Sequence, residues 1–175
     1  MKFKIVYLSQ TGFTKNYANW IKEELEAEML TYKEFLSKGY NQNEIIIYGS
    51  NLMASQIKGI KKIKEIVPQD KLIVFVTGAM PNNNKEIIDT MKNTNFTKEE
   101  QKHTPIYYYQ GGVNFEKLGI VQRNLLKAIR KMVNRKKEKT KEEEGMIEAL
   151  EKSFDATNKD NIKELVDYVK NNYKV

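Results

Sequence analysis

The chain has 175 residues, of which 40% are apolar and 30% charged, a composition typical of one globular domain. It has no cysteine and one histidine, His103, which excludes disulfides, thiolate chemistry, and zinc sites or proton relays built from several histidines. No apolar run reaches the roughly 18 residues of a membrane-spanning helix, and the N-terminus lacks the apolar stretch and cleavage site of a secretory signal. We therefore expect a cytoplasmic protein without a metal site.

The net charge of +7 is concentrated in one segment. Nine basic residues lie between Arg123 and Lys141 against one acidic residue, Glu138, so the rest of the chain is close to neutral. Because the basicity is local, the net charge by itself does not indicate nucleic-acid binding.

The first half of the chain alternates between strand and helix patterns. Phe3–Leu8 is short, apolar and rich in β-forming residues, as buried parallel strands are. Apolar residues recur every three or four positions over Thr14–Met29, which predicts a helix. Thr31–Leu36 is expected to be a weak second strand and Ile45–Tyr48 a third, and Met53–Val67 is expected to be a helix.

The second half continues this alternation with one exception. Leu72–Thr77 and Ile106–Tyr109 are the fourth and fifth predicted strands, and a helix is expected near Lys85–Met91 between them. A last helix is expected over Asn158–Tyr173. The exception is Phe115–Glu144, which we interpret as a basic, mostly helical insertion because it is too long for a loop.

Five strands alternating with helices predict an α/β fold with one parallel sheet covered on both sides. The sequence has no internal repeat and no sign of a second domain. We therefore expect residues 1–175 to form a single domain that contains the insertion over residues 115–144.

The segment Ser9-Gln10-Thr11-Gly12-Phe13-Thr14 lies between the first strand and the first helix. A helix N-terminus presents unpaired N–H groups and partial positive charge, and a glycine lets the backbone approach a ligand closely. With three hydroxyl side chains, this segment suits a phosphomonoester bound by neutral donors. It matches neither the Walker A pattern nor a dinucleotide fingerprint. The alternative is an ordinary strand-to-helix turn with Thr14 as N-cap.

Residues 5–18, IVYLSQTGFTKNYA, resemble the phosphate loop of flavodoxins, and the resemblance continues at the ends of three later strands. These later segments are Tyr48-Gly49-Ser50, Phe75-Val76-Thr77-Gly78 and Tyr107-Tyr108-Tyr109-Gln110-Gly111-Gly112. The last two segments, with the insertion behind them, are most similar to the flavodoxin-domain proteins that include menaquinone-dependent protoporphyrinogen dehydrogenase.

The resemblance implies a flavodoxin-like three-layer sandwich, with strand order 2-1-3-4-5 and FMN at the carboxyl end of the strands. It implies that Ser9, Gln10, Thr11, Gly12, Phe13 and Thr14 hold the phosphate. It also implies that the isoalloxazine lies between Ser50, Asn51, Leu52 and Met53 on one side and Thr77, Gly78, Ala79 and Met80 on the other. Gly111 and Gly112 would then lie near its open edge.

Two residues depart from the family pattern in the loop after the third strand. Met53 stands where flavodoxins place an aromatic residue that stacks on the flavin, and Ser55 stands where relatives have a glycine. A thioether can pack on a ring face. Met53 and Met80 are alternatively core or loop residues without a role in binding.

The insertion contains an amphipathic pattern from Leu118 onwards. An apolar stripe is expected along one helical face, formed by Leu118, Val121, Leu125, Ala128/Ile129 and Met132. Through residues 118–141 such a helix could lie on an anionic membrane. It could instead pack its stripe on the sheet, which the sheet's need for helical cover favours. Nucleic acid is not expected, because no aromatic residues are interleaved with the charges.

We expect no side chain to act as a catalytic acid, base or nucleophile. His103 precedes the fifth strand, where a solvated loop residue is expected, and Ser9 has no base in view. Three hypotheses therefore remain open. They are an FMN oxidoreductase acting on a quinone- or porphyrinogen-like molecule, an FMN electron carrier between protein partners, and a flavin-free binding module.

Overall fold

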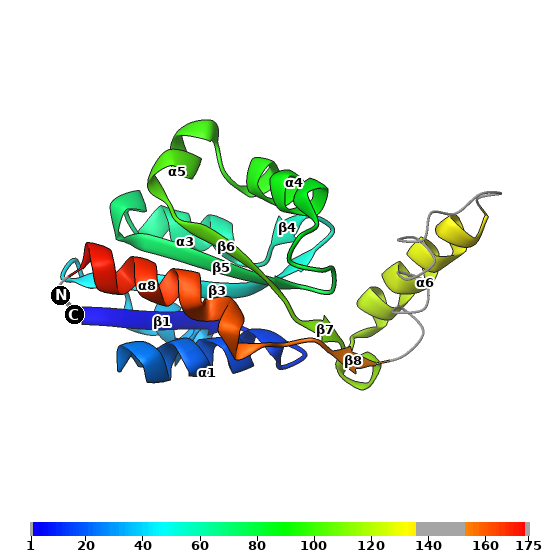
Figure 1. Ribbon diagram of the computed structural model, residues 1–175, viewed down its shortest axis with the longest axis horizontal. Coiled ribbons are helices and arrows are strands. Elements are labelled where there is room, and N and C mark those ends of the chain that lie inside the picture. Colours follow the sequence, from blue (N-terminus) through cyan, green and yellow to red (C-terminus); the bar gives the residue numbers. More distant parts are fainter. Residues whose placement is uncertain (1, 136–152, 174–175) are drawn as a thin grey trace.

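Five parallel strands form the centre of the molecule in the computed structural model, which describes residues 2–135 and 153–173 (Figure 1). Six side chains within the described part, at positions 121, 122, 125, 129, 130 and 133, are also left out of the description. The strands are β1 (Lys2–Leu8), β2 (Glu28–Thr31), β3 (Glu44–Met53), β5 (Leu72–Gly78) and β6 (Ile106–Gln110). Their order, β2-β1-β3-β5-β6, is the predicted order 2-1-3-4-5 once the short strand β4 (Gln56–Ile57) is set apart.

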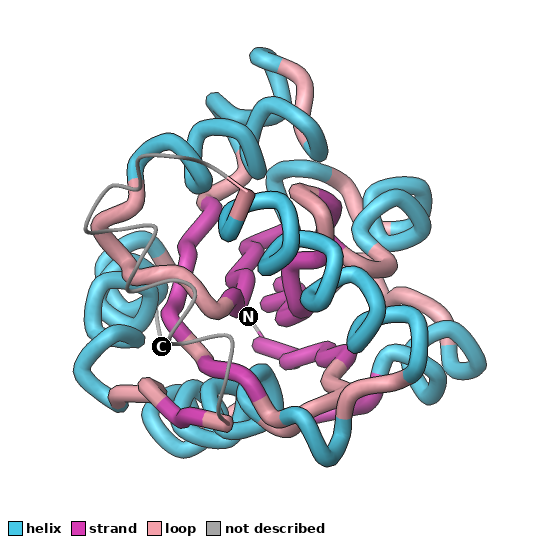
Figure 2. The backbone as a smooth tube through the Cα atoms, turned by 90° about the vertical axis from the view of Figure 1, so that its right-hand side faces the viewer, coloured by secondary structure: helices cyan, strands magenta, loops and turns pink. Residues whose placement is uncertain are grey.

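Helices cover both faces of this sheet, so the fold has three layers (Figure 2). One face is covered by α1 (Phe13–Leu25) and α8 (Lys163–Asn172), whose buried residues share one core cluster. The other face is covered by α2 (Tyr32–Lys38), α3 (Ile60–Ile66) and α4 (Lys85–Asn95). The remaining short helices are α5 (Lys98–His103), η1 (Gln69–Lys71), η2 (Phe115–Lys117) and η3 (Lys159–Ile162).

The two core clusters follow from the period of two along each strand. Ile45 and Ile47 of β3 pack toward α1 and α8, while Ile46 and Tyr48 pack toward α2 and α3. All four side chains are fully buried. A strand that is apolar at every position is therefore explained by burial on both faces, as in other parallel sheets.

The predicted strand Thr31–Leu36 is wrong. β2 ends at Thr31, and Tyr32–Lys38 forms α2. Thr31 is the N-cap of this helix, and its side chain accepts a hydrogen bond from the backbone N–H of Glu34, whose carboxylate accepts one from the Thr31 N–H. This capping box was readable in the sequence as Thr-x-x-Glu. Thr97 and Glu100 form another at the start of α5, a helix that the sequence patterns did not predict.

The predicted helix Met53–Val67 is wrong in its first half. β3 continues to Met53 and turns through Ala54 and Ser55 into β4, and α3 begins only at Ile60. Both turn residues have positive φ, of 48° and 63°. Two-residue hairpins of this kind normally use Asn-Gly or a similar pair, so Ala54-Ser55 carries no turn signal.

The insertion leaves and re-enters the fold through a small antiparallel pair, β7 (Gly112–Val113) and β8 (Phe154–Asp155). Between them, α6 (Ile120–Asn134) extends away from the end of the sheet (Figure 1). It therefore does not provide the sheet cover that the sequence interpretation favoured. Residues 136–144 of the predicted insertion lie outside the described residues. No helix within the described part is long and apolar enough to span a bilayer.

Candidate functional site

The loop after β1 delivers a helix N-terminus to the carboxyl end of the sheet. Gly12 is the N-cap of α1, with φ of 105°, and its N–H donates to the Ser9 hydroxyl (3.2 Å). No side-chain hydrogen bond from a described residue caps this helix, and its first turn has no acidic residue. The first N–H groups of a helix have no acceptor within it, so this end presents donors and partial positive charge.

Thr14 does not present its hydroxyl at the open end of this loop, as the sequence interpretation expected. It is the second residue of α1, and its hydroxyl lies 2.7 Å from that of Thr77 at the end of β5. Both side chains are buried. Thr14 therefore ties the helix to the sheet, and Gly12 rather than Thr14 is the N-cap. Hydroxyl groups for an anion are left to Ser9 and Thr11.

The end of β3 forms the next wall of the site. Asn51 lies beside Thr77 in the parallel register of β3 and β5. Its side-chain Oδ1 is buried and has no hydrogen-bond partner, although it lines a cavity. Ser50, in contrast, is fully buried and donates to the carbonyl of Lys58 (2.8 Å). The Ser50 side chain therefore holds the end of β3 against the segment at Lys58 and does not line the cavity.

The hairpin after Asn51 is fixed from outside by Asn95 of α4. The Asn95 amide donates to the carbonyl oxygens of Ser55 and Met91 (both 2.7 Å), and its oxygen accepts from the N–H of Ile57 (2.9 Å). A non-glycine residue in the left-handed region costs roughly 1–2 kcal/mol. Asn95 therefore stabilises a turn that Ala54 and Ser55 disfavour. Sequence reasoning did not identify Asn95, and a lone polar residue on a helix carries no such signal.

The last two walls are the chain segments that follow β5 and β6. The Gly111 N–H donates to the Gly78 carbonyl (2.7 Å), and the Tyr108 hydroxyl donates to the Met80 carbonyl (3.0 Å). Burial raises the pKa of Tyr108 to about 12, so this phenol stays a neutral donor at physiological pH. A side chain at Gly112 would come within 2.2 Å of the Phe154 carbonyl oxygen, so the chain passes too closely for any other residue.

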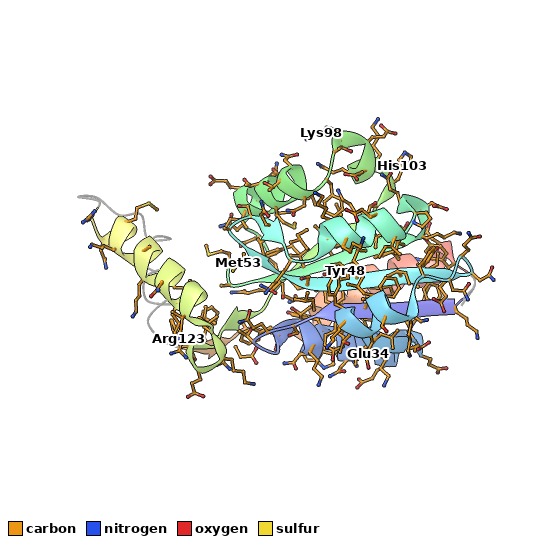
Figure 3. The ribbon with its side chains drawn as sticks, turned by 180° about the vertical axis from the view of Figure 1, so that it is seen from behind. Glu34, Tyr48, Met53, Lys98, His103 and Arg123 are labelled. Atoms are coloured by element: carbon orange, nitrogen blue, oxygen red, sulfur yellow. The ribbon has the colours of Figure 1, made fainter. Side chains whose placement is uncertain are left out.

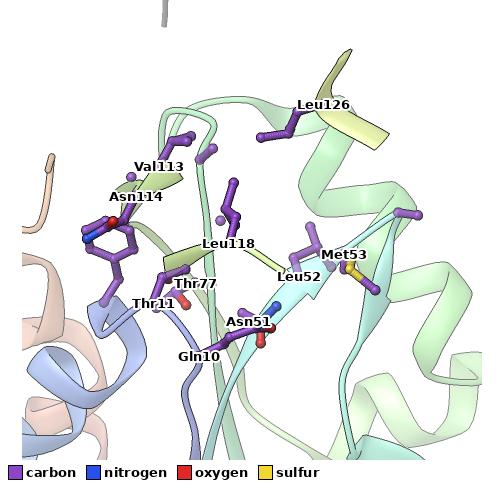
Figure 4. A pocket seen from close by; sticks show the side chains of 16 residues that line it. Gln10, Thr11, Asn51, Leu52, Met53, Thr77, Val113, Asn114, Leu118 and Leu126 are labelled. Atoms are coloured by element: carbon purple, nitrogen blue, oxygen red, sulfur yellow. The ribbon is translucent and has the colours of Figure 1, made fainter. Parts of the chain in front are cut away.

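These walls enclose an open cavity of about 200 Å³ (Figure 4). Eleven of the residues that the resemblance implied line it: Gln10, Thr11, Phe13, Asn51, Leu52, Met53, Thr77, Gly78, Ala79, Gly111 and Gly112. The other five, Ser9, Gly12, Thr14, Ser50 and Met80, do not. Five lining residues were not predicted: Ala54, Val113, Asn114, Leu118 and Leu126.

The cavity is uncharged. None of the sixteen described residues that line it is acidic or basic, and most are apolar. Its polar groups are the side chains of Gln10, Thr11, Asn51, Thr77 and Asn114 together with backbone groups. Such a site suits a flat, largely apolar molecule held by a few hydrogen bonds.

His103 lies far from this cavity. It is the last residue of α5 and lies on the opposite side of the molecule from Met53 (Figure 3). Its exposed ring contacts the Glu99 carboxylate (3.1 Å). His103 is therefore a solvated residue as expected, at a helix end rather than in a loop. Within residues 2–135 and 153–173, no cluster of His, Asp or Glu could hold a metal ion.

The arrangement agrees with a comparison of the sequence with known families. The model of the flavodoxin domain matches residues 4–141, which is more than half of the chain. The chain belongs to the flavodoxin domain family. FMN is the cofactor typical of this family. The matched region spans β1 to β6 and part of the insertion, so it includes every wall of the cavity.

Solved structures give a weaker likeness. A flavodoxin from the domain Archaea is 16% identical, with 63% of this chain and 85% of that chain covered and a TM-score of 0.38. A search of curated proteins found no match. Membership of the flavodoxin domain family therefore rests on the family model.

Proposed function

We propose that this chain binds FMN at the carboxyl end of its sheet and passes electrons between the flavin and a small conjugated molecule, such as a quinone or a porphyrinogen. The observation that carries the proposal is the combination of a mostly apolar cavity, whose described lining residues are uncharged, with a helix N-terminus that no described side chain caps. A phosphorylated flavin needs both an anion site and an apolar site.

The phosphate would be held by the loop after β1. The N–H groups at the start of α1 and the hydroxyls of Ser9 and Thr11 are neutral donors, and the helix dipole favours an anion at this end. No basic residue is needed for such a site.

The ring system would be held by the apolar walls and by Asn51. A buried acceptor without a donor costs free energy, and the Oδ1 of Asn51 would gain a donor from an N–H at the edge of a flavin. Leu52 and Met53 line the same wall, so a thioether is available where flavodoxins place an aromatic residue. When bound, FMN supplies the electron transfer, and the protein supplies binding, orientation and an environment of low polarity.

The substrate class is suggested by the part of the cavity wall that lies outside the sheet. Leu118 and Leu126 of the inserted segment, with Val113 of β7 just before it, add apolar surface beside the proposed flavin site. Such surface suits an apolar planar molecule. An electron carrier would instead offer a charged surface at the cofactor to a protein partner, whereas the described residues that line this cavity are neutral.

Asn51→Leu tests the cofactor site because it should raise the stability of the free protein and lower its affinity for FMN. Removing the unpartnered oxygen should stabilise the free protein by about 1–2 kcal/mol, while FMN affinity, measured by quenching of flavin fluorescence, should fall at least tenfold. Thr104→Val is the matched control, because Thr104 also has a buried hydroxyl without a partner but does not line the cavity. It should raise stability and leave FMN affinity unchanged. If wild-type protein does not quench FMN fluorescence, the proposal is wrong.

The substrate class can be tested separately with the FMN-loaded protein. After chemical reduction of the flavin, a water-soluble quinone should reoxidise it faster than an electron-transfer protein such as cytochrome c does. The reverse order would favour the electron carrier. Absorbance at the flavin band gives both rates.

A further inference from the structure

Helix α6 presents a stripe of basic side chains beside the cavity. Arg123, Lys127, Lys131 and Arg135 follow one another at intervals of four residues, so they lie on one helical face. All four side chains are exposed. No acidic residue occurs between Leu118 and Arg135, so nothing on the helix itself neutralises this stripe.

The same helix exposes large apolar side chains. Ile120 and Met132 are 78% and 63% exposed, whereas the third exposed large apolar residue of the described part, Leu36, is only 38% exposed. Of the apolar stripe predicted from the sequence, Ala128 and Met132 face solvent, and Leu118 lines the cavity. Because α6 extends past the sheet (Figures 1 and 3), the sheet does not cover the exposed side chains of Ala128 and Met132.

We propose that α6 docks the protein on an anionic lipid surface. A helix with a basic face and an apolar face lies in the plane of such a surface, with its apolar residues in the boundary and its cations on the phosphate groups. Charge complementarity selects this occupant, because each lysine or arginine near an anionic bilayer contributes attraction. The exposed apolar side chains of Ile120 and Met132 would be more favourably placed in the lipid boundary than in water.

Docking would also bring the cavity to the lipid. Leu126 of α6 and Leu118 just before it line the cavity, so the mouth of the site borders the docking helix (Figure 4). A small apolar molecule dissolved in the bilayer would then reach the site without crossing water. The docking itself does not depend on the proposed function, because none of the four basic residues lines the cavity.

A nucleic acid fits the surface less well. Proteins that bind single strands interleave aromatic side chains with their cations, and residues 118–135 contain no aromatic residue. The phosphate backbone of a nucleic acid also offers no apolar surface to cover Ile120 and Met132. Binding to nucleic acid is therefore treated as an outcome that would overturn the proposal.

The test is co-sedimentation of the full chain, with and without FMN, with vesicles of phosphatidylcholine alone or mixed with phosphatidylglycerol. We expect binding to the mixed vesicles only, weakened by salt and independent of FMN. Lys127→Glu with Lys131→Glu should lower the partition coefficient at least about tenfold. Lys33→Glu with Lys61→Glu is the matched control, since these exposed lysines lie on α2 and α3 and give the same change in net charge. It should change binding less than twofold.

A third variant separates the apolar contribution. Met132→Ser keeps every charge and should weaken binding by a smaller factor than the double charge reversal. Circular dichroism would confirm that each variant remains folded. The proposal is wrong if both double variants lose binding equally, if vesicles without anionic lipid bind as well, or if the chain binds single-stranded RNA and not vesicles. Loss of FMN binding alone would contradict the proposed function and leave the docking intact.

Discussion

Two turns at the same end of the sheet reach unusual backbone conformations by different means. In the loop after β1 the positive φ falls on Gly12, a residue that adopts it without strain. In the hairpin after β3 the positive φ values fall on Ala54 and Ser55, which disfavour them. In the first turn, the residue type itself allows the conformation. In the second, the hydrogen bonds of Asn95 help to impose it.

The difference shows which turn owes its conformation to its own residue type and which needs contacts from another element. At the start of α1, the glycine N-cap adopts its positive φ without strain and needs no neighbouring element to impose it. The hairpin that carries Met53 and Ala54 is held in part by hydrogen bonds from Asn95 of α4. Its strain resembles that stored at many binding sites, where the surrounding structure holds a residue in a disfavoured conformation.

Gly12→Ala should give the largest effect on binding. Gly12 and Gly39 both have positive φ, of 105° and 80°, and an added Cβ would meet no atom within 4 Å at either position. Both alanine variants should therefore lose stability through backbone strain of roughly 1–2 kcal/mol, measured by thermal unfolding. Only Gly12→Ala should also weaken FMN binding, by tenfold or more, because Gly39 ends α2, away from the cavity. Equal loss of affinity in the two variants would break the comparison.

Asn95→Ala should act on stability rather than directly on FMN binding, and its loss of stability should exceed that of Gly12→Ala. It removes an acceptor from the N–H of Ile57 and donors from two carbonyl groups, and one unsatisfied buried group costs about 1–3 kcal/mol. Urea unfolding of the free protein measures this loss. Asn95→Asp is the control, since it keeps the acceptor for the Ile57 N–H but sets a carboxylate oxygen against the carbonyls of Ser55 and Met91, so it should recover no stability at neutral pH. If Asn95→Ala unfolds at the wild-type urea concentration, the hairpin does not depend on α4.

Ser55→Gly should give the smallest effect, and it should be stabilising. Glycine relieves the left-handed strain at φ of 63°, partly offset by the entropy of the unfolded chain, for a net gain of up to about 1 kcal/mol. Glu26→Gly is the matched control, because Glu26 has φ of 48° at the end of α1 and is exposed. Both variants should unfold at higher temperature, and only Ser55→Gly should alter FMN affinity. A lower melting temperature for Ser55→Gly would show that the hairpin is not strained.

The strands, and the place of the loop over Ser9–Thr14 between the first strand and the first helix, were predictable from the sequence. Buried parallel strands are apolar at every position, so β1, β3, β5 and β6 were located by composition alone. The loop over Ser9–Thr14 was located because it follows an apolar strand and precedes a helical pattern. Capping boxes at Thr31 and Thr97 carried equally local signals, and α2 and α5 were missed because those signals were not used.

What the tertiary structure decided depends on contacts between distant segments. The Thr14 hydroxyl is directed to Thr77, and Ser50 to the carbonyl of Lys58, so neither faces the cavity. The hairpin after β3 depends on Asn95, about 40 positions away in the chain. The direction of α6 depends on where the sheet ends. A sequence pattern records which side chains a local conformation favours, whereas the partner that a buried polar group finds is set only when the chain packs.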